Sequence, residues 1–176
     1  MGEHATEQGT APALCGHLMD DRVSTILKLE PARHKWWNKP LAIFGGRTIP
    51  AELAILALEL SAGEKGAWMN SRGTATGVVD LTTSPEGSAH GKYVTRRTSL
   101  PDFVSERLKR MFQAAQIKRG CPDLVIWNED SKRMRLVEVK CPHWDRPTKE
   151  QELFLKTAEK AGILVEIVEW EFCETA

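Results

Sequence analysis

Apolar side chains recur at helical spacing, every third or fourth residue, in three segments of the chain. This spacing predicts helices over residues 50–62 and 101–116, and a third helix that begins at the capping box Thr148–Gln151 and ends before Gly162. We expect Lys118, Arg119 and Gly120 to close the second helix. The third helix is expected to bury one side, formed by Leu153, Phe154, Thr157, Ala158 and Ala161.

The last third of the chain also carries a predicted hairpin and a final strand. The apolar runs Asp123–Trp127 and Met134–Lys140 are separated by Asn128–Lys132, whose composition is typical of a turn. Ile163–Trp170 alternates apolar and acidic residues, which predicts a half-buried strand. Residues 68–81 are strand-like but are interrupted by Gly73 and Gly77.

These elements predict an α/β fold in which a mixed central sheet is flanked by helices on both sides. The chain of 176 residues is long enough for one domain. We divide it into an N-terminal extension over residues 1–45, partly flexible, and a domain over residues 46–176 with an insertion near residues 73–100. Residues 1–20 are expected to be a flexible lead-in, and residues 82–91 have the composition of a loop.

The composition and the N-terminal sequence say more about where the protein is located than about what it binds. Apolar residues make up 41% and charged residues 27% of the chain, as in ordinary globular proteins. No run approaches the roughly 18 apolar residues of a membrane span, and the N-terminus lacks a secretory signal, so we expect a cytoplasmic protein without a membrane partner. The cysteines, without a C-x-x-C pair, are expected to be reduced thiols. A formal net charge of zero does not by itself indicate nucleic acid.

The candidate chemistry lies on the predicted hairpin. Side chains alternate faces along a strand, so Glu138 and Lys140 point the same way, and Asp123 starts the partner strand near the same edge. Two carboxylates suit Mg²⁺, which prefers oxygen ligands, and the Val139 carbonyl is a further candidate ligand. Lys140 would orient or deprotonate an attacking water, or neutralise charge that develops on a phosphate.

A polar, solvated sheet surface is the alternative interpretation of these charges. The neighbours of the pair are the apolar residues Leu136, Val137 and Val139, however, so the second strand is expected to be largely buried. A charge in such a strand usually has a partner or a metal. The sequence therefore favours a metal-dependent phosphodiesterase site at Asp123, Glu138 and Lys140.

Three spaced motifs resemble a known family. Lys118–Trp127 (KRGCPDLVIW), Leu136–Lys140 (LVEVK) and Thr148–Gln151 (TKEQ) are similar to the virus-type replication-repair nuclease (VRR-NUC) domain of the PD-(D/E)XK superfamily. The resemblance covers about residues 119–168. It implies a restriction-endonuclease-like core and a Mg²⁺-dependent endonuclease, with Mn²⁺ able to substitute.

The resemblance also implies further site residues and partners. It implies that an acidic residue of the first core helix completes the metal site, with Glu52 as the candidate and Glu59 and Glu64 as alternatives. A charge that only complements the helix N-terminus is the other interpretation of Glu52. The resemblance also implies that Gln151 lies beside the catalytic strand. Gly120 matches a glycine at which the backbone approaches phosphate. The implied substrate is branched, flapped or four-way-junction DNA in repair, recombination or phage biology, and the implied state is a homodimer. A restriction or defence nuclease and a catalytically silent nucleic-acid-binding module remain alternatives.

Basic residues concentrate just before the predicted hairpin and are candidates for DNA contact. A solvated helix face is the alternative. A second candidate is the tryptophan pair Trp36 and Trp37, flanked by basic residues. The candidates of the first group, with Gly120, are Lys92, Arg96, Arg97, Arg107, Arg110, Lys118 and Arg119.

Overall fold

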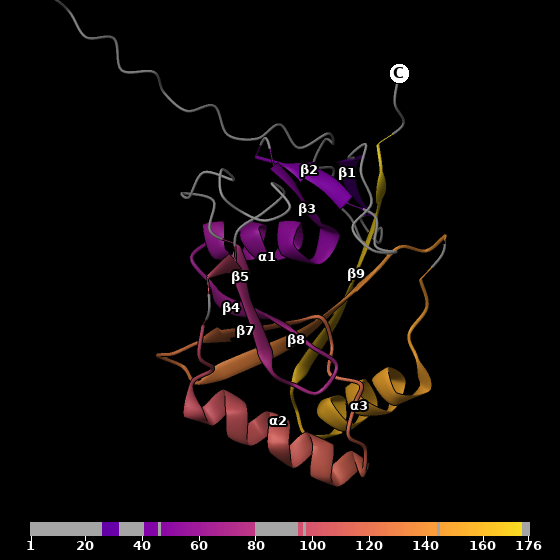
Figure 1. The fold of residues 1–176 in the computed structure, drawn as a ribbon. Coiled ribbons are helices and arrows are strands. Elements are labelled where there is room, and N and C mark those ends of the chain that lie inside the picture. The colour runs from indigo at the N-terminus through magenta and orange to yellow at the C-terminus, as the bar shows by residue number, and fades with distance from the viewer. Residues whose placement is uncertain are drawn as a thin grey trace, which may run out of the picture.

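The computed structural model describes residues 26–31, 41–45, 47–79, 95–96, 98–143 and 145–173. Within them lie three helices and nine strands that form one mixed sheet (Figure 1). The helices are α1 (Ala51–Ser61), α2 (Asp102–Ala115) and α3 (Lys149–Lys160). The strands are β1 (Leu27–Pro31), β2 (Leu41–Phe44), β3 (Arg47–Pro50), β4 (Lys65–Met69), β5 (Ala75–Val79), β6 (Thr95–Arg96), β7 (Leu124–Asn128), β8 (Arg133–Lys140) and β9 (Leu164–Phe172).

The strand order places β8 inside the sheet. The order is β3-β2-β1-β9-β8-β7-β4-β5-β6. β8 pairs antiparallel with β7 and parallel with β9, while β9 pairs parallel with β1 on its other side. Both edges of β8 are therefore hydrogen-bonded, and the strand that carries the candidate chemistry is held from two sides.

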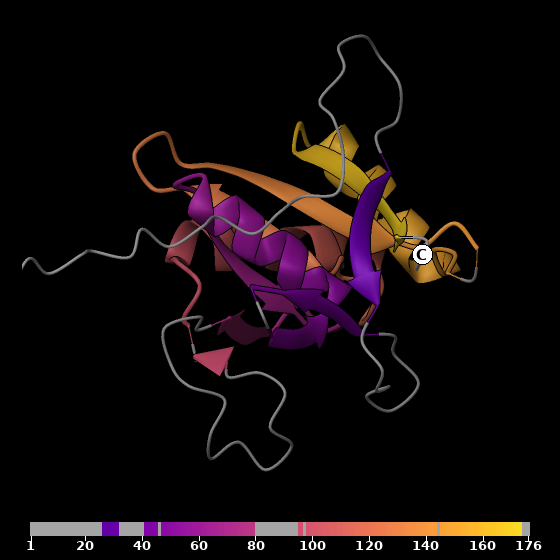
Figure 2. The same ribbon diagram turned by 90° about the horizontal axis from the view of Figure 1, so that it is seen from above.

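The helices cover both faces of the sheet. In Figure 1, α1 lies above β4, β7 and β8, and α2 and α3 lie below them. From above, α1 crosses in front of the strands (Figure 2). The expected architecture, a mixed sheet with helices on both sides, is confirmed.

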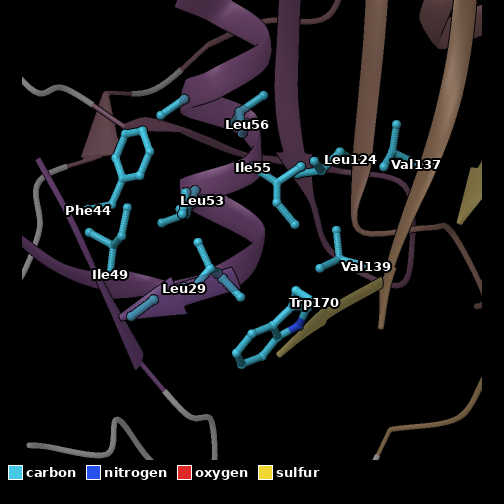
Figure 3. Packing of buried hydrophobic residues seen from close by; sticks show 14 of the residues in the cluster. Leu29, Phe44, Ile49, Leu53, Ile55, Leu56, Leu124, Val137, Val139 and Trp170 are labelled. Carbon is cyan, nitrogen blue, oxygen red and sulfur yellow. The ribbon is translucent and has the colours of Figure 1, made fainter. Parts of the chain in front are cut away.

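A separate hydrophobic core fills each side. The first lies around α1 and includes Leu124, Val137, Val139 and Trp170 from the sheet (Figure 3). α1 is buried almost all round because it contacts β2 and β3 as well as β4 and β7. The second core packs α2 and α3 against the opposite face, where Phe154 of α3 is fully buried.

The predicted helices are confirmed, with two local corrections. α2 ends at Ala115 and is capped by Gln116, whose backbone is left-handed (φ 55°), so Lys118–Gly120 lie beyond the helix and do not close it. In α3 the capping box of Thr148 and Gln151 is present. Its buried side is Phe154, Leu155 and Ala158, whereas Leu153 is 44% exposed and Ala161 is also exposed. Leu153 and Ala161 line a groove between α2 and α3.

The strand predictions are confirmed for the hairpin β7–β8 and for β9. Residues 68–81, expected to be strand-like, include the end of β4 and all of β5. Residues 27–31 and 41–44, which we placed in an N-terminal extension, contribute β1 and β2 to the same sheet. The predicted lead-in over residues 1–20, the loop over residues 82–91 and the tryptophan pair lie outside the described residues.

Two further expectations concern the thiols and the membrane. Cys121, Cys141 and Cys173 form no disulfide with one another, the first two are buried, and Cys15 lies outside the described residues. No helix in the described part of the chain is long and apolar enough to cross a membrane.

Candidate active site

The β7–β8 hairpin brings the predicted acidic residues together. Leu124 lies opposite Val137; Asp123 immediately precedes Leu124, and Glu138 immediately follows Val137. Val137 and Val139 pack into the first core, as Figure 3 shows. Because side chains alternate along a strand, Glu138 and Lys140 point to the other face, where α3 lies. The predicted orientation of these two residues is confirmed.

Asp123 is fixed by hydrogen bonds to both neighbouring strands. Its Oδ2 accepts a hydrogen bond from the backbone N–H of Val139 at 3.1 Å. Its own carbonyl accepts one from the N–H of Met69, at the end of β4, at 2.7 Å. The carboxylate therefore sits at a defined place at the mouth of the hairpin although it precedes the first residue of β7.

One carboxylate oxygen of Glu138 has two hydrogen-bonding partners, and the other has none among the described residues. The side chain is 0% exposed. Its Oε1 lies 2.6 Å from Lys140 Nζ and 2.5 Å from Gln151 Nε2, while Oε2 is buried with no hydrogen-bond partner among the described residues. An unpaired buried carboxylate oxygen is costly, so this atom is suited to a cation.

Gln151 joins the start of α3 to this carboxylate. Its Oε1 accepts from the Thr148 N–H at 2.9 Å, which closes the capping box, and its Nε2 donates to Glu138. The cap therefore fixes which way the amide points. The predicted position of Gln151 beside the catalytic strand is the one observed.

Lys140 is nearly buried between two carboxylates. The residue is 7% exposed, and its Nζ lies 2.6 Å from Glu138 Oε1 and 3.3 Å from Asp145 Oδ2. A turn positions Asp145, since its N–H donates to the Cys141 carbonyl at 2.9 Å. Asp145 was not among the residues predicted for the site. Pro142, just after the strand, is a turn signal that would have indicated a return of the chain toward Lys140.

Burial and like charges shift the ionisation of the cluster. Burial, followed by the charges of Glu138 and Glu52, raises the pKa of Asp123 to about 7, against the opposing effects of the Val139 N–H and Lys140. Burial likewise raises the pKa of Glu138. For Lys140, burial acts to lower the pKa, but the hydrogen bond to Glu138 and the surrounding carboxylates raise it overall. The cluster thus carries excess negative charge that a cation would relieve.

Cys121 lies in the same electrostatic environment. Burial, and then the charges of Glu138 and Asp123, raise the pKa of the Cys121 thiol. This thiol therefore stays protonated at neutral pH and is neither a nucleophile nor a metal ligand in this state.

The residues fit a metal held by few protein ligands. Among the described residues, no three His, Cys, Asp or Glu side chains are grouped to hold a metal ion. Mg²⁺ commonly uses only one or two carboxylates and keeps waters, and the unpaired Oε2 of Glu138 beside Asp123 matches that requirement. Glu52, at the first turn of α1, acts on Asp123 through its charge. The ligand roles of Glu52 and of the Val139 carbonyl stay predictions.

The predicted DNA-contacting residues are only partly described. Arg110, Lys118 and Arg119 are exposed, and Arg107 is half-buried over the Phe103 ring. Arg110 lies 3.8 Å from Glu106. Arg96 is in β6, while Lys92 and Arg97 lie outside the described residues.

Gly120 is buried against the start of α3. Its φ of 106° is in a region that favours glycine, and a Cβ there would lie 2.5 Å from the Glu150 carbonyl oxygen. Packing against α3 therefore requires a glycine at this position. A phosphate contact by its backbone stays a prediction.

Comparisons with known proteins identify relatives of part of the chain. Fanconi-associated nuclease 1 of Ailuropoda melanoleuca is 48% identical over 64 residues, which are 36% of this chain and 6% of that protein. The Homo sapiens protein of the same name is 46% identical over 48 residues, 27% of this chain and 5% of that protein. The chain thus matches only a small part of the length of these relatives.

A crystal structure of paFAN1 bound to 2nt 5′flap DNA with gap aligns with a TM-score of 0.35 and 23% identity, over 41% of this chain and 14% of that one. The family model for the VRR-NUC domain matches residues 82–170, about half of the 176 residues, and this segment contains Asp123, Glu138, Lys140 and Gln151. The chain belongs to the VRR-NUC domain family.

Proposed function

We propose that this chain is a metal-dependent nuclease that hydrolyses phosphodiester bonds of DNA. The observation that carries the proposal is the buried carboxylate of Glu138, with one oxygen unpaired, between Asp123 and the ammonium of Lys140. A polar sheet surface would not bury these charges together. Membership of the VRR-NUC family supports the same conclusion.

Asp123 and Glu138 would hold Mg²⁺, or Mn²⁺ in its place, with Glu52 and the Val139 carbonyl as candidate further ligands. The bound ion supplies polarisation of the scissile phosphate and a lower pKa for the attacking water. Since the pKa of Lys140 is raised, its side chain stays protonated at neutral pH. Of the roles expected for it, this favours orienting the water and stabilising negative charge on the phosphate over removing a proton.

Gln151 acts as a positioning residue for Glu138. It donates to Oε1, so that Oε2, which has no hydrogen-bond partner among the described residues, is the oxygen that would be available to a cation. Asp145 shares Lys140 with Glu138 and thereby helps to hold the ammonium at the edge of the sheet. Each catalytic group is thus held by a second group of this chain.

The substrate we propose is branched or flapped DNA, cut by a homodimer. The resemblance to the VRR-NUC family motivates this choice, and the name of the curated relatives, Fanconi-associated nuclease 1, supports the reaction class. Because the chain matches only a small part of each relative, its own specificity must be measured.

The test uses the purified chain with fluorescent flap, four-way-junction and linear duplex DNA, in Mg²⁺, Mn²⁺ or EDTA. We expect metal-dependent cutting of the flap or junction, and a loss of about two orders of magnitude or more for Asp123→Asn. Arg133→Ala, at the exposed far end of the β7–β8 hairpin, is the control and should cut normally. Size-exclusion chromatography with light scattering reports the oligomer.

Two outcomes would overturn the proposal. Equal cutting by the wild type and Asp123→Asn would place the activity elsewhere or in a contaminant. DNA binding without cutting in every metal would favour a silent binding module. A third outcome would change only the substrate: preferential cutting of a particular sequence in linear duplex DNA, instead of branched DNA, would indicate a restriction or defence nuclease.

A further inference from the structure

A pocket of about 490 Å³ lies between α2 and the turn that joins β4 to β5. We call it the α2 pocket. Three cationic and three apolar residues are among those that line it. These are Arg72, Lys109 and Lys118, and Leu100, Phe112 and Ile117.

The α2 pocket lies at the same end of the sheet as the candidate active site. Arg72 is on the turn after β4, and the last residue of β4, Met69, donates to the carbonyl of Asp123. Ser71, next to Arg72, accepts from the Cys121 N–H at 3.1 Å. On the other wall, Ile117 and Lys118 lie on the segment that leads from α2 to Asp123. The backbone thus links both walls directly to Asp123.

The cations of the α2 pocket are not neutralised within the described part of the chain. None of the ion pairs there includes Arg72, Lys109 or Lys118, and no acidic residue is among the described residues that line the pocket. A larger cavity of about 790 Å³, at the opposite end of β8, differs in this respect: there Arg135 is paired with Glu59 and Glu166. The α2 pocket is therefore matched to an anion.

The apolar residues favour a ligand that has an apolar part in addition to its negative charge. Leu100, Phe112 and Ile117 are partly buried against the second core and present apolar surface to the pocket. The volume falls within the range of about 300–1,000 Å³ that is usual for small-ligand sites. Proteins that bind single-stranded nucleic acid combine apolar surface, which contacts the bases, with cations, which contact the phosphates.

We propose that the α2 pocket binds an unpaired nucleotide of the DNA substrate, with the base against Leu100, Phe112 and Ile117 and the adjoining phosphates near Arg72, Lys109 and Lys118. The inference rests on the proposed nuclease function, since it places this nucleotide beside the bond that is cut. It gives the enzyme a physical means of telling flapped or branched DNA from a continuous duplex, in which every base is stacked.

The test measures DNA binding by the Asp123→Asn protein, so that no substrate is consumed. Fluorescence anisotropy would compare a flap DNA, the same flap with abasic residues and a fully paired duplex. We expect the abasic flap to bind about fivefold or more weakly than the normal flap, the lower end of base stacking. Arg72→Ala, Lys109→Ala and Lys118→Ala should each weaken flap binding and lower the salt-dependence slope by about 0.7.

The matched control is Arg133→Ala, an exposed arginine at the far end of the hairpin, which should leave both quantities unchanged. Equal affinity for normal and abasic flaps, or pocket variants that behave like Arg133→Ala, would overturn the inference. Cutting by the otherwise wild-type chain, assayed in parallel, separates the two proposals. If cutting of flap DNA persists while the pocket variants bind normally, the nuclease proposal stands and the pocket proposal falls.

Discussion

At the scale of single residues, the candidate site depends on which oxygen of the Glu138 carboxylate each neighbouring side chain contacts. Lys140 and Gln151 share one oxygen, and the other has no hydrogen-bond partner among the described residues. Breaking a buried ion pair by removing one partner typically costs about 3–5 kcal/mol, so truncating Lys140 would test folding as much as catalysis. Variants that keep the shape of the side chain are therefore more informative.

Gln151 allows its two contacts to be tested separately. Gln151→Glu keeps an oxygen for the Thr148 N–H but cannot donate to Glu138, so we expect cutting to fall. Thr148→Ala removes the cap from α3 and should lower the free energy of unfolding by about 0.5–2 kcal/mol while cutting persists. Urea unfolding and a cleavage assay on both variants provide the measurement. If the two variants lose cutting equally, Gln151 acts only through the helix cap.

Asp123 should make stability depend on pH when divalent cations are absent. Its pKa is about 7 in the folded protein and 3.8 without the fold. The folded state therefore holds a proton that the unfolded state has lost between these values, and stability falls as pH rises from about 4 to 7. The largest possible loss is about 1.4 kcal/mol for each pH unit between the two pKa values.

The comparison with Asp123→Asn isolates this effect. In EDTA, the variant should gain stability relative to the wild type on going from pH 5 to pH 8, measured by urea unfolding. At pH 8, Mg²⁺ should stabilise the wild type more than the variant. Parallel pH profiles for the two proteins would show that Asp123 does not titrate in this range.

At the scale of elements, the predictable parts of the structure are those set by nearby residues. α2 follows from the stripe of Val104, Leu108, Met111 and Ala115, and the β7–β8 hairpin from two apolar runs and a turn. The site residues Asp123, Glu138 and Lys140 could be predicted because one hairpin carries all three. Gln151 came from the family resemblance.

The parts that the sequence did not predict depend on distant partners. β1 is a strand because it pairs with β9, near the other end of the chain, and no local pattern contains that pairing. In α3 both Leu153 and Leu155 are apolar, and only the position of the sheet decides that Leu155 is buried. Asp145 lies beside Lys140 because of the turn that follows β8, and the geometry of this turn was not predicted.

At the scale of the whole molecule, β1 and β2 are part of the sheet and of the first core. Leu29, Ala42 and Phe44 are buried there, and β1 covers the edge of β9. A chain of residues 46–176 would lose these contacts and leave the edge of β9 without a partner. We expect it to unfold at a lower temperature than the full chain and to aggregate.

The control for this truncation is a chain of residues 26–176, which keeps every strand of the sheet. It should unfold near the temperature of the full chain. Thermal unfolding and size-exclusion chromatography of the three proteins give the comparison. Equal unfolding temperatures for all three would show that β1 and β2 contribute little to the fold.

The position of β8 between β7 and β9 has a consequence for how activity is lost on heating. A strand bonded along both edges is among the last parts of a protein to exchange its amide hydrogens, because its opening requires most of the domain to open. Glu138 and Lys140 are attached to this strand, so fraying of the outer strands leaves their geometry intact. Thermal inactivation and global unfolding should consequently be one event.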